Sequence, residues 1–210
     1  MHWLHLFLRK RYSVQVVRQG SLLRQNNHCS IQLIGEDAVN RALRKLITQY
    51  AYATPPYPTS YALLDALREQ TPPNLQYLIK DLFEDITLFS NRTLLATATM
   101  RADGQYDVSI EVEARKFKAD GNGNETEVPM DDWIDIGAFT KPASGRKYGD
   151  TLYRQRMHIT QRNSTFTFTV ARMPATAGID PFALLIDRIP DDNLKDVILD
   201  SGPVSASTGR

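Results

Sequence analysis

The chain has 210 residues, 42% of them hydrophobic and 23% charged, a composition typical of a soluble globular protein with one large domain or two small ones. Its net charge of +1 gives no overall attraction to nucleic acid or to an anionic membrane. The single cysteine, Cys29, excludes an internal disulfide and fits a reducing compartment. No apolar stretch approaches the ~20 residues that span a bilayer, and basic residues follow the apolar start, so we expect no transmembrane helix and no signal peptide.

Apolar residues recur with a helical period in the first part of the chain. Residues 36–50 carry apolar side chains at spacings of three and four, which predicts an amphipathic helix. A proline-rich linker, 50–58, separates it from a second helix around Leu63–Leu67. The segment Pro72–Ile86 predicts a third helix, because proline in the first turn loses no hydrogen bond. Three helices with short connections indicate a small helical array over 35–90.

From Thr93 onward the apolar residues alternate, which predicts strands. Asp103-Gly104 is a strong two-residue hairpin signal after the first of them. The segments 152–160 and 165–171 predict a further pair of strands joined near residue 162. Five or more strands at this spacing indicate an antiparallel β-sandwich of the Ig-like kind. The fold class that we expect is therefore α+β, with a helical segment followed by the sandwich.

Segments across both halves resemble a known family. Three of them resemble the region after the active site of bacterial aminopeptidase N-like zinc peptidases, closest to the branch associated with ABC-type permeases: Gly35–Leu43, Pro55–Ser60 and Asp81–Leu88. Others resemble the C-terminal β domain of the same family: Glu125–Pro129, Asp132–Gly137, Ala177–Pro181, Leu185–Arg188 and Pro190–Asn193. The resemblance covers about residues 35–198, and none of these segments carries a catalytic or metal-binding motif of the family.

The resemblance implies where the chemistry of the family belongs. The family holds zinc with H-E-x-x-H and a downstream glutamate; this motif is absent here and would lie upstream of residue 1. The family also uses a tyrosine to stabilise the oxyanion. Val17 occupies its place in Val17–Leu22, Gln19 replaces the usual lysine, and nothing around the alternative, Tyr12, matches. We therefore expect no catalytic residue, no metal ligand and no cofactor in this chain, although the resembled family carries zinc.

The resemblance divides the chain into five segments. We expect a divergent lead-in at 1–34, the helical segment at 35–90, the β-sandwich at 91–180, a short helical or irregular segment at 181–199 that covers a sheet edge, and a disordered tail at 200–210. The departure before residue 35 motivates the hypothesis of a truncated or frame-altered gene copy, which the coding sequence upstream would test.

The leading functional hypothesis is a non-catalytic C-terminal module of an aminopeptidase-like zinc peptidase. One alternative is a part of an active zinc aminopeptidase completed by an upstream or separate zinc domain. Another is an interaction module of a membrane ABC-type transporter, which predicts an exposed apolar patch on the helical part. The partners would be a zinc peptidase domain or a permease, and the chain would be cytoplasmic or membrane-associated through that partner.

Other candidate sites have simpler structural interpretations. Asp120–Asn124 has the spacing of a calcium loop but lacks its distal glutamate, so a hairpin turn is favoured. His2 and His5 are two ligands and make no metal site. His28 beside Cys29 could be a reactive pair, but no orienting group is evident.

Two acidic clusters near the end of the chain complete the candidates. Asp131, Asp132 and Asp135 flank Trp133; because 132 lies opposite 133 and 135 on a strand, we expect a solvated edge with a buried tryptophan rather than acid–base chemistry. Asp187–Asn193 could be a recognition surface, but an ion-paired turn that fixes the chain end is favoured. Sequons occur at three asparagines and would carry glycans only in a secretory pathway: Asn91, Asn124 and Asn163.

Overall fold

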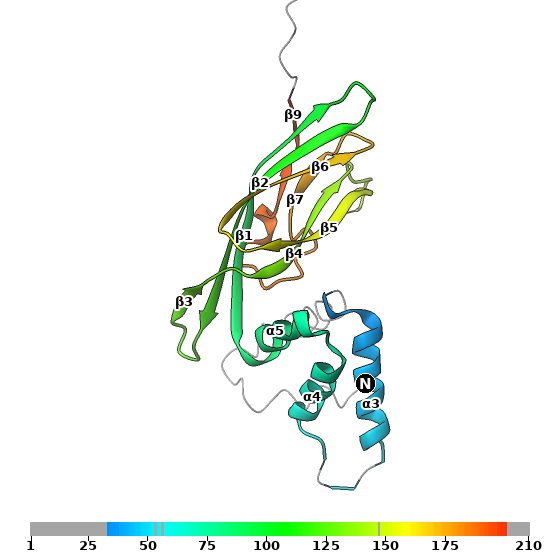
Figure 1. Ribbon diagram of the computed structural model, residues 1–210, viewed down its shortest axis with the longest axis vertical. Helices are drawn as coiled ribbons and strands as arrows, with labels where there is room; N and C mark the ends of the chain where they lie inside the picture. Colours follow the sequence, from blue (N-terminus) through cyan, green and yellow to red (C-terminus); the bar gives the residue numbers. More distant parts are fainter. Residues whose placement is uncertain (1–32, 53, 56, 147, 201–210) are drawn as a thin grey trace, which may run out of the picture. The chain divides into compact units, whose positions relative to one another are not determined.

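The computed structural model describes residues 33–52, 54–55, 57–146 and 148–200. The chain forms two compact units, Met1–Thr87 with Ala119–Asn122 and Leu88–Lys118 with Gly123–Arg210. The described α-helices lie in the first and nearly all strand residues in the second, so the fold is α+β (Figure 1). No helix of the described residues is long and apolar enough to cross a membrane.

From residue 36 on, the described part of the helical unit contains two regular helices and a compound third one. The elements are α3 (Glu36–Tyr50), α4 (Ser60–Gln70), the 3-10 turn η1 (Pro73–Leu75), α5 (Gln76–Ile79) and the π-helical turn η2 (Lys80–Glu84). α3 packs along α4, and buried apolar side chains such as Ala42, Leu67 and Ile79 fill the space between the helices. The predicted helix over 36–50 is confirmed to its ends.

The predicted third helix is wrong at both ends. The prolines at its start form a 3-10 turn, and its last turn widens to a π-helical turn in which the Asp85 N–H donates to Lys80 O. Ile86 belongs to strand β1 (Ile86–Met100). Buried and exposed residues alternate at the start of β1, but two of the buried ones, Thr87 and Asn91, are polar. The apolar residues therefore do not alternate there, and the helical period of the residues before β1 extends the predicted helix into the strand.

The strand unit has two mostly antiparallel sheets. Beside β1, its strands are β2 (Tyr106–Ala119), β3 (Glu125–Val128), β4 (Asp132–Phe139), β5 (Thr151–Ile159), β6 (Asn163–Val170), β7 (Thr176–Ile179), β8 (Leu194–Asp196) and β9 (Ile198–Leu199). One sheet has the order β3-β2-β1-β9, with β6 also paired to β2; the other has the order β5-β4-β7-β8. The inward side chains of β2, β4 and β7 form its core: Val108, Ile110, Val112, Ile134, Ile136, Ala177 and Ile179.

The turns follow the predictions, but one strand pair does not. Gly104 has φ +82° between β1 and β2, and the Asp120–Asn124 segment is the turn between β2 and β3, both as predicted. β5 and β6 were expected to pair with each other. Instead β5 pairs with β4 and β6 with β2, so the chain changes sheet at residues 160–162. Tyr153 and Phe168 stack between these two strands with ring centroids 3.9 Å apart.

The C-terminal segment contributes strands to both sheets. β8 pairs antiparallel with β7, whereas β9 pairs parallel with β1. The 3-10 turn η3 (Pro190–Asp192) precedes β8. Thr93 of β1 fixes the crossing: its Oγ1 donates to Asn193 O at 2.6 Å and accepts from Ile179 N at 3.2 Å. Residues 181–193 are irregular apart from η3, as predicted, whereas residues 194–199 form two short strands, one at an edge of each sheet.

Candidate functional site

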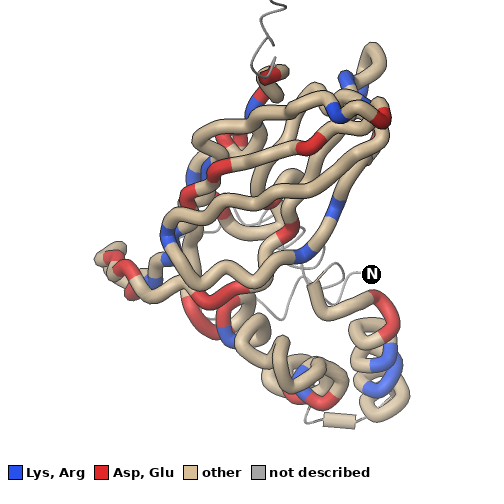
Figure 2. The backbone as a smooth tube through the Cα atoms, turned by 45° about the horizontal axis from the view of Figure 1, so that its top comes forward, with Lys and Arg blue, Asp and Glu red and all other residues tan. Residues whose placement is uncertain are grey.

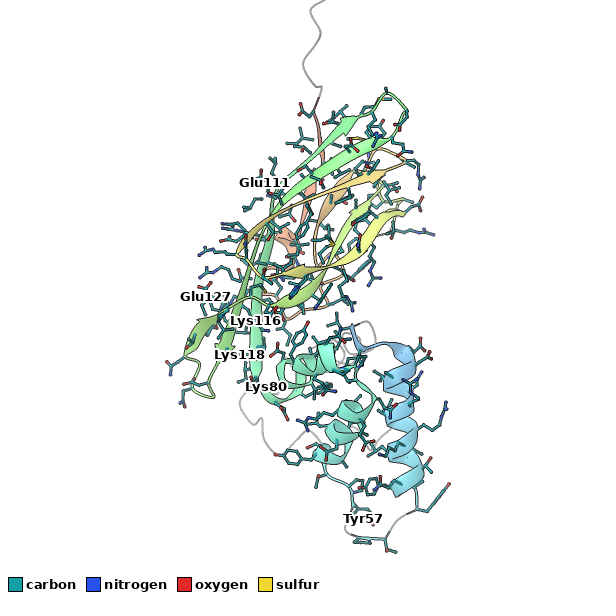
Figure 3. The ribbon with its side chains drawn as sticks, viewed as in Figure 1. Tyr57, Lys80, Glu111, Lys116, Lys118 and Glu127 are labelled. Carbon is teal, nitrogen blue, oxygen red and sulfur yellow. The ribbon has the colours of Figure 1, made fainter. Side chains whose placement is uncertain are left out.

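An uncharged stretch joins α3 to α4 and carries exposed side chains with apolar surface. Residues 46–64 contain no Asp, Glu, Lys or Arg, and the described part of this connection is tan in Figure 2. Ile47 is 65% exposed, Tyr52 fully exposed, Tyr57 59% and Tyr61 53%. Figure 3 labels Tyr57 on this connection. We call these four residues the tyrosine surface. Tyrosine, which combines an apolar ring with a polar hydroxyl, is enriched at protein interfaces.

The tyrosine surface is exposed because the helical unit covers only part of the apolar stripe of α3. Ala38, Val39 and Ala42 are buried in its first half, but Leu46 is only partly buried and Ile47 faces outward. The backbone after the helix turns sharply at Tyr52, whose φ of +62° is unusual for a residue with a large side chain. The predicted amphipathic stripe is thus present, and the described residues cover its second half only in part.

Cationic side chains border this surface on α3. Arg41 Nε donates to Gln70 Oε1 at 2.9 Å, and Lys45 pairs with Glu69 of α4. Arg44 makes no ion pair with the part of the chain that the structure describes. With Thr48 and Gln49 these three line an open concavity of about 420 Å³. The arrangement offers a polar, positively charged margin beside an aromatic surface, as protein interfaces do.

Asp135 of β4 is buried at 4% exposure and receives two guanidinium groups from β5. Its Oδ2 accepts from Arg154 Nε and Nη2 at 2.9 and 2.7 Å, and its Oδ1 accepts from Arg156 Nε at 2.9 Å. The antiparallel register produces this, because it places residue 135 opposite 156 and residue 137 opposite 154 on one face. Both carboxylate oxygens are therefore engaged.

Glu113 of β2 is held in the same way. Its Oε1 accepts from Arg162 Nε at 2.6 Å, and Arg92 of β1 pairs with Oε2. Burial raises the pKa of the Glu113 carboxyl, but the hydrogen bonds and charges of Arg162 and Arg92 outweigh it, so the pKa lies below its ordinary value. The carboxylate therefore stays ionised. It joins β2 to Arg92 on β1 and to Arg162 just before β6.

Two further buried carboxylates have both oxygens occupied. Lys116 Nζ of β2 lies 2.9 and 3.0 Å from the two oxygens of Asp132 on β4, which ties one sheet to the other. The oxygens of Asp180 accept the N–H groups of Leu184 and Leu185 at 2.9 and 3.0 Å. Carboxylates bound this way fix strands and turns.

The acidic cluster at 187–193 holds the chain end mainly by hydrogen bonds. Asp187 accepts from the N–H groups of Asn91 and Ile189, both at 3.1 Å, and burial raises its pKa. With its amide oriented to match its neighbours, Asn193 donates to Asn91 O at 2.8 Å and to Asp187 Oδ2 at 3.1 Å. Arg188 supplies the ion pair of this turn, to Glu125 of β3. These contacts support the interpretation of the cluster as a fixing turn.

The prediction of a buried tryptophan among solvated acids is wrong. Trp133 is 37% exposed, whereas Asp132 and Asp135 are 2% and 4% exposed. Residues 132 and 133 do lie on opposite faces, as predicted. His158 covers Trp133 with ring centroids 4.9 Å apart, and its Nε2 lies 2.6 Å from Asp131 Oδ1. Lysine and arginine partners on neighbouring strands, which a single strand cannot reveal, explain why both acids are buried on their opposite faces of β4.

The remaining candidates from the sequence lie outside the described residues. They are Val17 and Tyr12, the pairs His2 and His5, and His28 with Cys29. Within the described ranges no group of three or more His, Cys, Asp or Glu could hold a metal ion. The one histidine described, His158, is stacked on Trp133, so the described residues do not fit the zinc site of the resembled family.

Sequence reasoning did not single out the tyrosine surface or the arginine-paired carboxylates. The uncharged run 46–64 was the available signal for the first. For the second, the signal was the spacing of Arg154 and Arg156, two residues apart on one strand. The sequence matches none of the protein-family models and none of the curated proteins with which it was compared.

Proposed function

We propose that this chain is a non-catalytic module of an aminopeptidase-like zinc peptidase and that it acts by docking to a partner domain. The tyrosine surface carries this proposal, because the interaction hypothesis predicts an exposed apolar patch on the helical part. Tyrosine supplies a large, rigid and amphipathic contact area, and it is among the residues that contribute most to binding energy at protein interfaces.

The buried carboxylates support the non-catalytic part of the proposal. A carboxylate takes part in general acid–base or metal chemistry only where it can reach a substrate or a metal ion. Asp132, Asp135, Glu113 and Asp180 each have both oxygens bound to donors of the strand unit. The strand unit, as an Ig-like sandwich, would then have a structural role in the module.

The partner that fits best is the zinc peptidase domain that the resemblance places before the helical segment. The test mixes the purified chain with a separately produced zinc domain of an aminopeptidase N-like protein and measures affinity by calorimetry. We expect binding by the unaltered chain. Replacing Tyr52, Tyr57 and Tyr61 together with serine should weaken binding at least tenfold, because each anchor contributes ~1 kcal/mol or more.

The matched control replaces two exposed leucines of the strand unit, Leu94 and Leu95, with serine, which should leave the affinity unchanged. Equal affinity of the tyrosine variant and the unaltered chain would reject the docking proposal. Stoichiometric zinc and hydrolysis of aminoacyl arylamides by the chain alone would reject the non-catalytic part. Hydrolysis that appears only in the mixture would favour a chain that completes an active aminopeptidase, and binding to a permease instead would favour the transporter partner.

A further inference from the structure

The β2–β3 turn contains an asparagine, Asn122, whose side chain is exposed and is not held by any described residue. All residues of Asp120–Asn124 are exposed. Asp120 Oδ1 accepts from Asn122 N at 2.9 Å, which folds the turn back on itself. The side-chain amide of Asn122 makes no hydrogen bond with the described part of the chain. Gly123 follows with φ +90°, and a Cβ built on it would have no atom within 4 Å.

We propose that Asn122 is a site of spontaneous deamidation that converts it to a mixture of aspartate and isoaspartate. The backbone nitrogen of Gly123 attacks Cγ of the Asn122 side chain, the C–N bond of the side-chain amide breaks, and ammonia leaves. The resulting cyclic imide then takes up one water at either carbonyl. Overall, the side-chain amide and one water give a carboxylic acid and ammonia. The reaction needs no oxidant or reductant.

The structure selects Asn122 among the comparable positions. A residue after the asparagine that lacks Cβ lets its nitrogen approach the side chain with the least hindrance. Asn124 and Asn163 precede Glu125 and Ser164, whose side chains hinder that approach. Asn91 and Asn193 are 1% exposed and held among the strands.

Two aspartate–glycine pairs could form the same imide, but their side chains are engaged. Asp103 Oδ1 accepts from Gln105 N at 3.0 Å, and Asp120 Oδ1 accepts from Asn122 N. A carboxylate also releases oxygen far less readily than an amide releases ammonia. Among these turn residues, Asn122 is therefore the one that can release ammonia, is exposed and has a side chain that no described residue binds.

The product would alter contacts that begin two residues further on. Isoaspartate routes the backbone through the side chain and so inserts an additional methylene between β2 and β3. Glu127 of β3 binds Arg115 at 2.5 and 3.0 Å, Glu125 pairs with Arg188, and both guanidinium groups lie over the Phe117 ring. A shifted β3 and an added negative charge beside Glu125 would loosen this group of contacts.

The experiment incubates the full chain at mildly alkaline pH below its unfolding temperature and follows it by peptide mapping. We expect the mass gain of an amide-to-acid conversion in the peptide that contains residue 122, with two products of equal mass and different retention. The isoaspartate product should accept a methyl group from an isoaspartyl methyltransferase. Asn122→Gln should abolish the gain, and the matched control Asn124→Gln should retain it. Aged protein should show faster hydrogen exchange in β3 than fresh protein.

Several results would overturn the inference. One is an unchanged residue 122 in the folded chain under conditions that convert a synthetic peptide of residues 117–128, since the fold would then protect it. Equal conversion at Asn124 would remove the selectivity, and methylation that persists in Asn122→Gln would place the product elsewhere. None of these outcomes depends on the docking partner or on the peptidase resemblance.

Discussion

Asp135 is the carboxylate on which the β4–β5 pair depends most. Its side chain is 4% exposed, while its partners Arg154 and Arg156 keep 36% and 27% of their side chains exposed. Arg154 also lies over the Phe182 ring, 4.8 Å from its centroid. The buried charge is therefore compensated by groups whose outer atoms stay in water, which lowers the cost of burying them.

Asp135→Asn should destabilise the protein, because it leaves two guanidinium groups without their counter-charge. We expect a loss of about 2–3 kcal/mol in the free energy of unfolding, below the ~3–5 of a fully buried pair since the arginines are partly exposed. Urea titration measures it. The control is Asp150→Asn, whose pair with Arg172 is exposed on both sides and should change stability by less than ~0.5 kcal/mol. Equal effects of the two substitutions would contradict the prediction.

Asp180 makes stability depend on pH in a defined direction. Burial raises the pKa of its carboxyl from 3.8 to about 6, although the N–H groups of Leu185 and Leu184 favour the charged form. The folded protein therefore binds this proton more tightly than the unfolded chain does. The corresponding stabilisation is complete below pH 3.8 and is lost as the pH rises through about 6.

Comparison with Asp180→Asn isolates this contribution, because the other titrating groups are common to both proteins. The unfolding free energy of the unaltered protein minus that of the variant should fall by about 3 kcal/mol across this pH window, at ~1.4 kcal/mol per pKa unit. Urea titrations of both proteins over the window measure it. A difference that stays constant with pH would show that Asp180 does not titrate there.

Which of the aspartates at 131, 132 and 135 would be buried could not be predicted from their own strand. Alternation correctly placed 132 opposite 133, since it depends only on the period of the backbone. The choice of side was set by Lys116 on β2 and by the two arginines on β5. Whether a charged side chain is buried depends on oppositely charged residues that are distant in sequence. The pattern of residues within one strand does not identify those partners.

At the level of elements, β1 and β7 meet at a position that only glycine can occupy. A Cβ on Gly178 would overlap the backbone oxygen of Asn193 and Oγ1 of Thr93. The first of these atoms is backbone and cannot rotate away. The close approach lets Thr93 bind both Ile179 and Asn193, so it fixes the strand that crosses from one sheet to the other.

Gly178→Ala should therefore cost at least the ~1–3 kcal/mol typical of overpacking, and more if the β7–β8 pair separates. Thermal unfolding of the variant would show it, together with faster hydrogen exchange at Ile179. Gly121→Ala is the control, because a Cβ there meets nothing within 4 Å. Unchanged stability of Gly178→Ala would mean that the two strands lie further apart than described.

The elements that the sequence predicted well are those with a strong local signal. Residues 36–50 have a helical apolar period, and Gly104 and Gly123 mark their turns by the conformations that glycine favours. The start of β1 was missed because three of its inward residues, Thr87, Asn91 and Thr93, are polar. The β5–β6 pairing was wrong because a short connection between strands favours a hairpin, and only packing against the opposite sheet reveals that the chain changes sheet.

For the whole molecule, the two compact units predict separate responses to core substitutions. Leu67 is 4% exposed in the helical unit and Ile110 is fully buried in the strand unit. Each replacement by alanine should cost ~2–5 kcal/mol in its own unit. Calorimetry should show two transitions, with Leu67→Ala lowering the temperature of one and Ile110→Ala that of the other. A single transition that both variants shift equally would indicate one cooperative unit.

The position of β8 and β9 has a consequence for synthesis on the ribosome. They are the last strands in chain order, yet β9 pairs with β1, about a hundred residues earlier, at Thr97 and Ala98. The sheet that contains β8 is incomplete until residue 196 has left the exit tunnel, and the sheet that contains β9 until residue 199 has left it. Until then the β1 edge and the apolar residues of β7 remain open to other nascent chains. Closure by such distant segments also slows folding, so this protein should depend on holding chaperones during translation more than its modest size suggests.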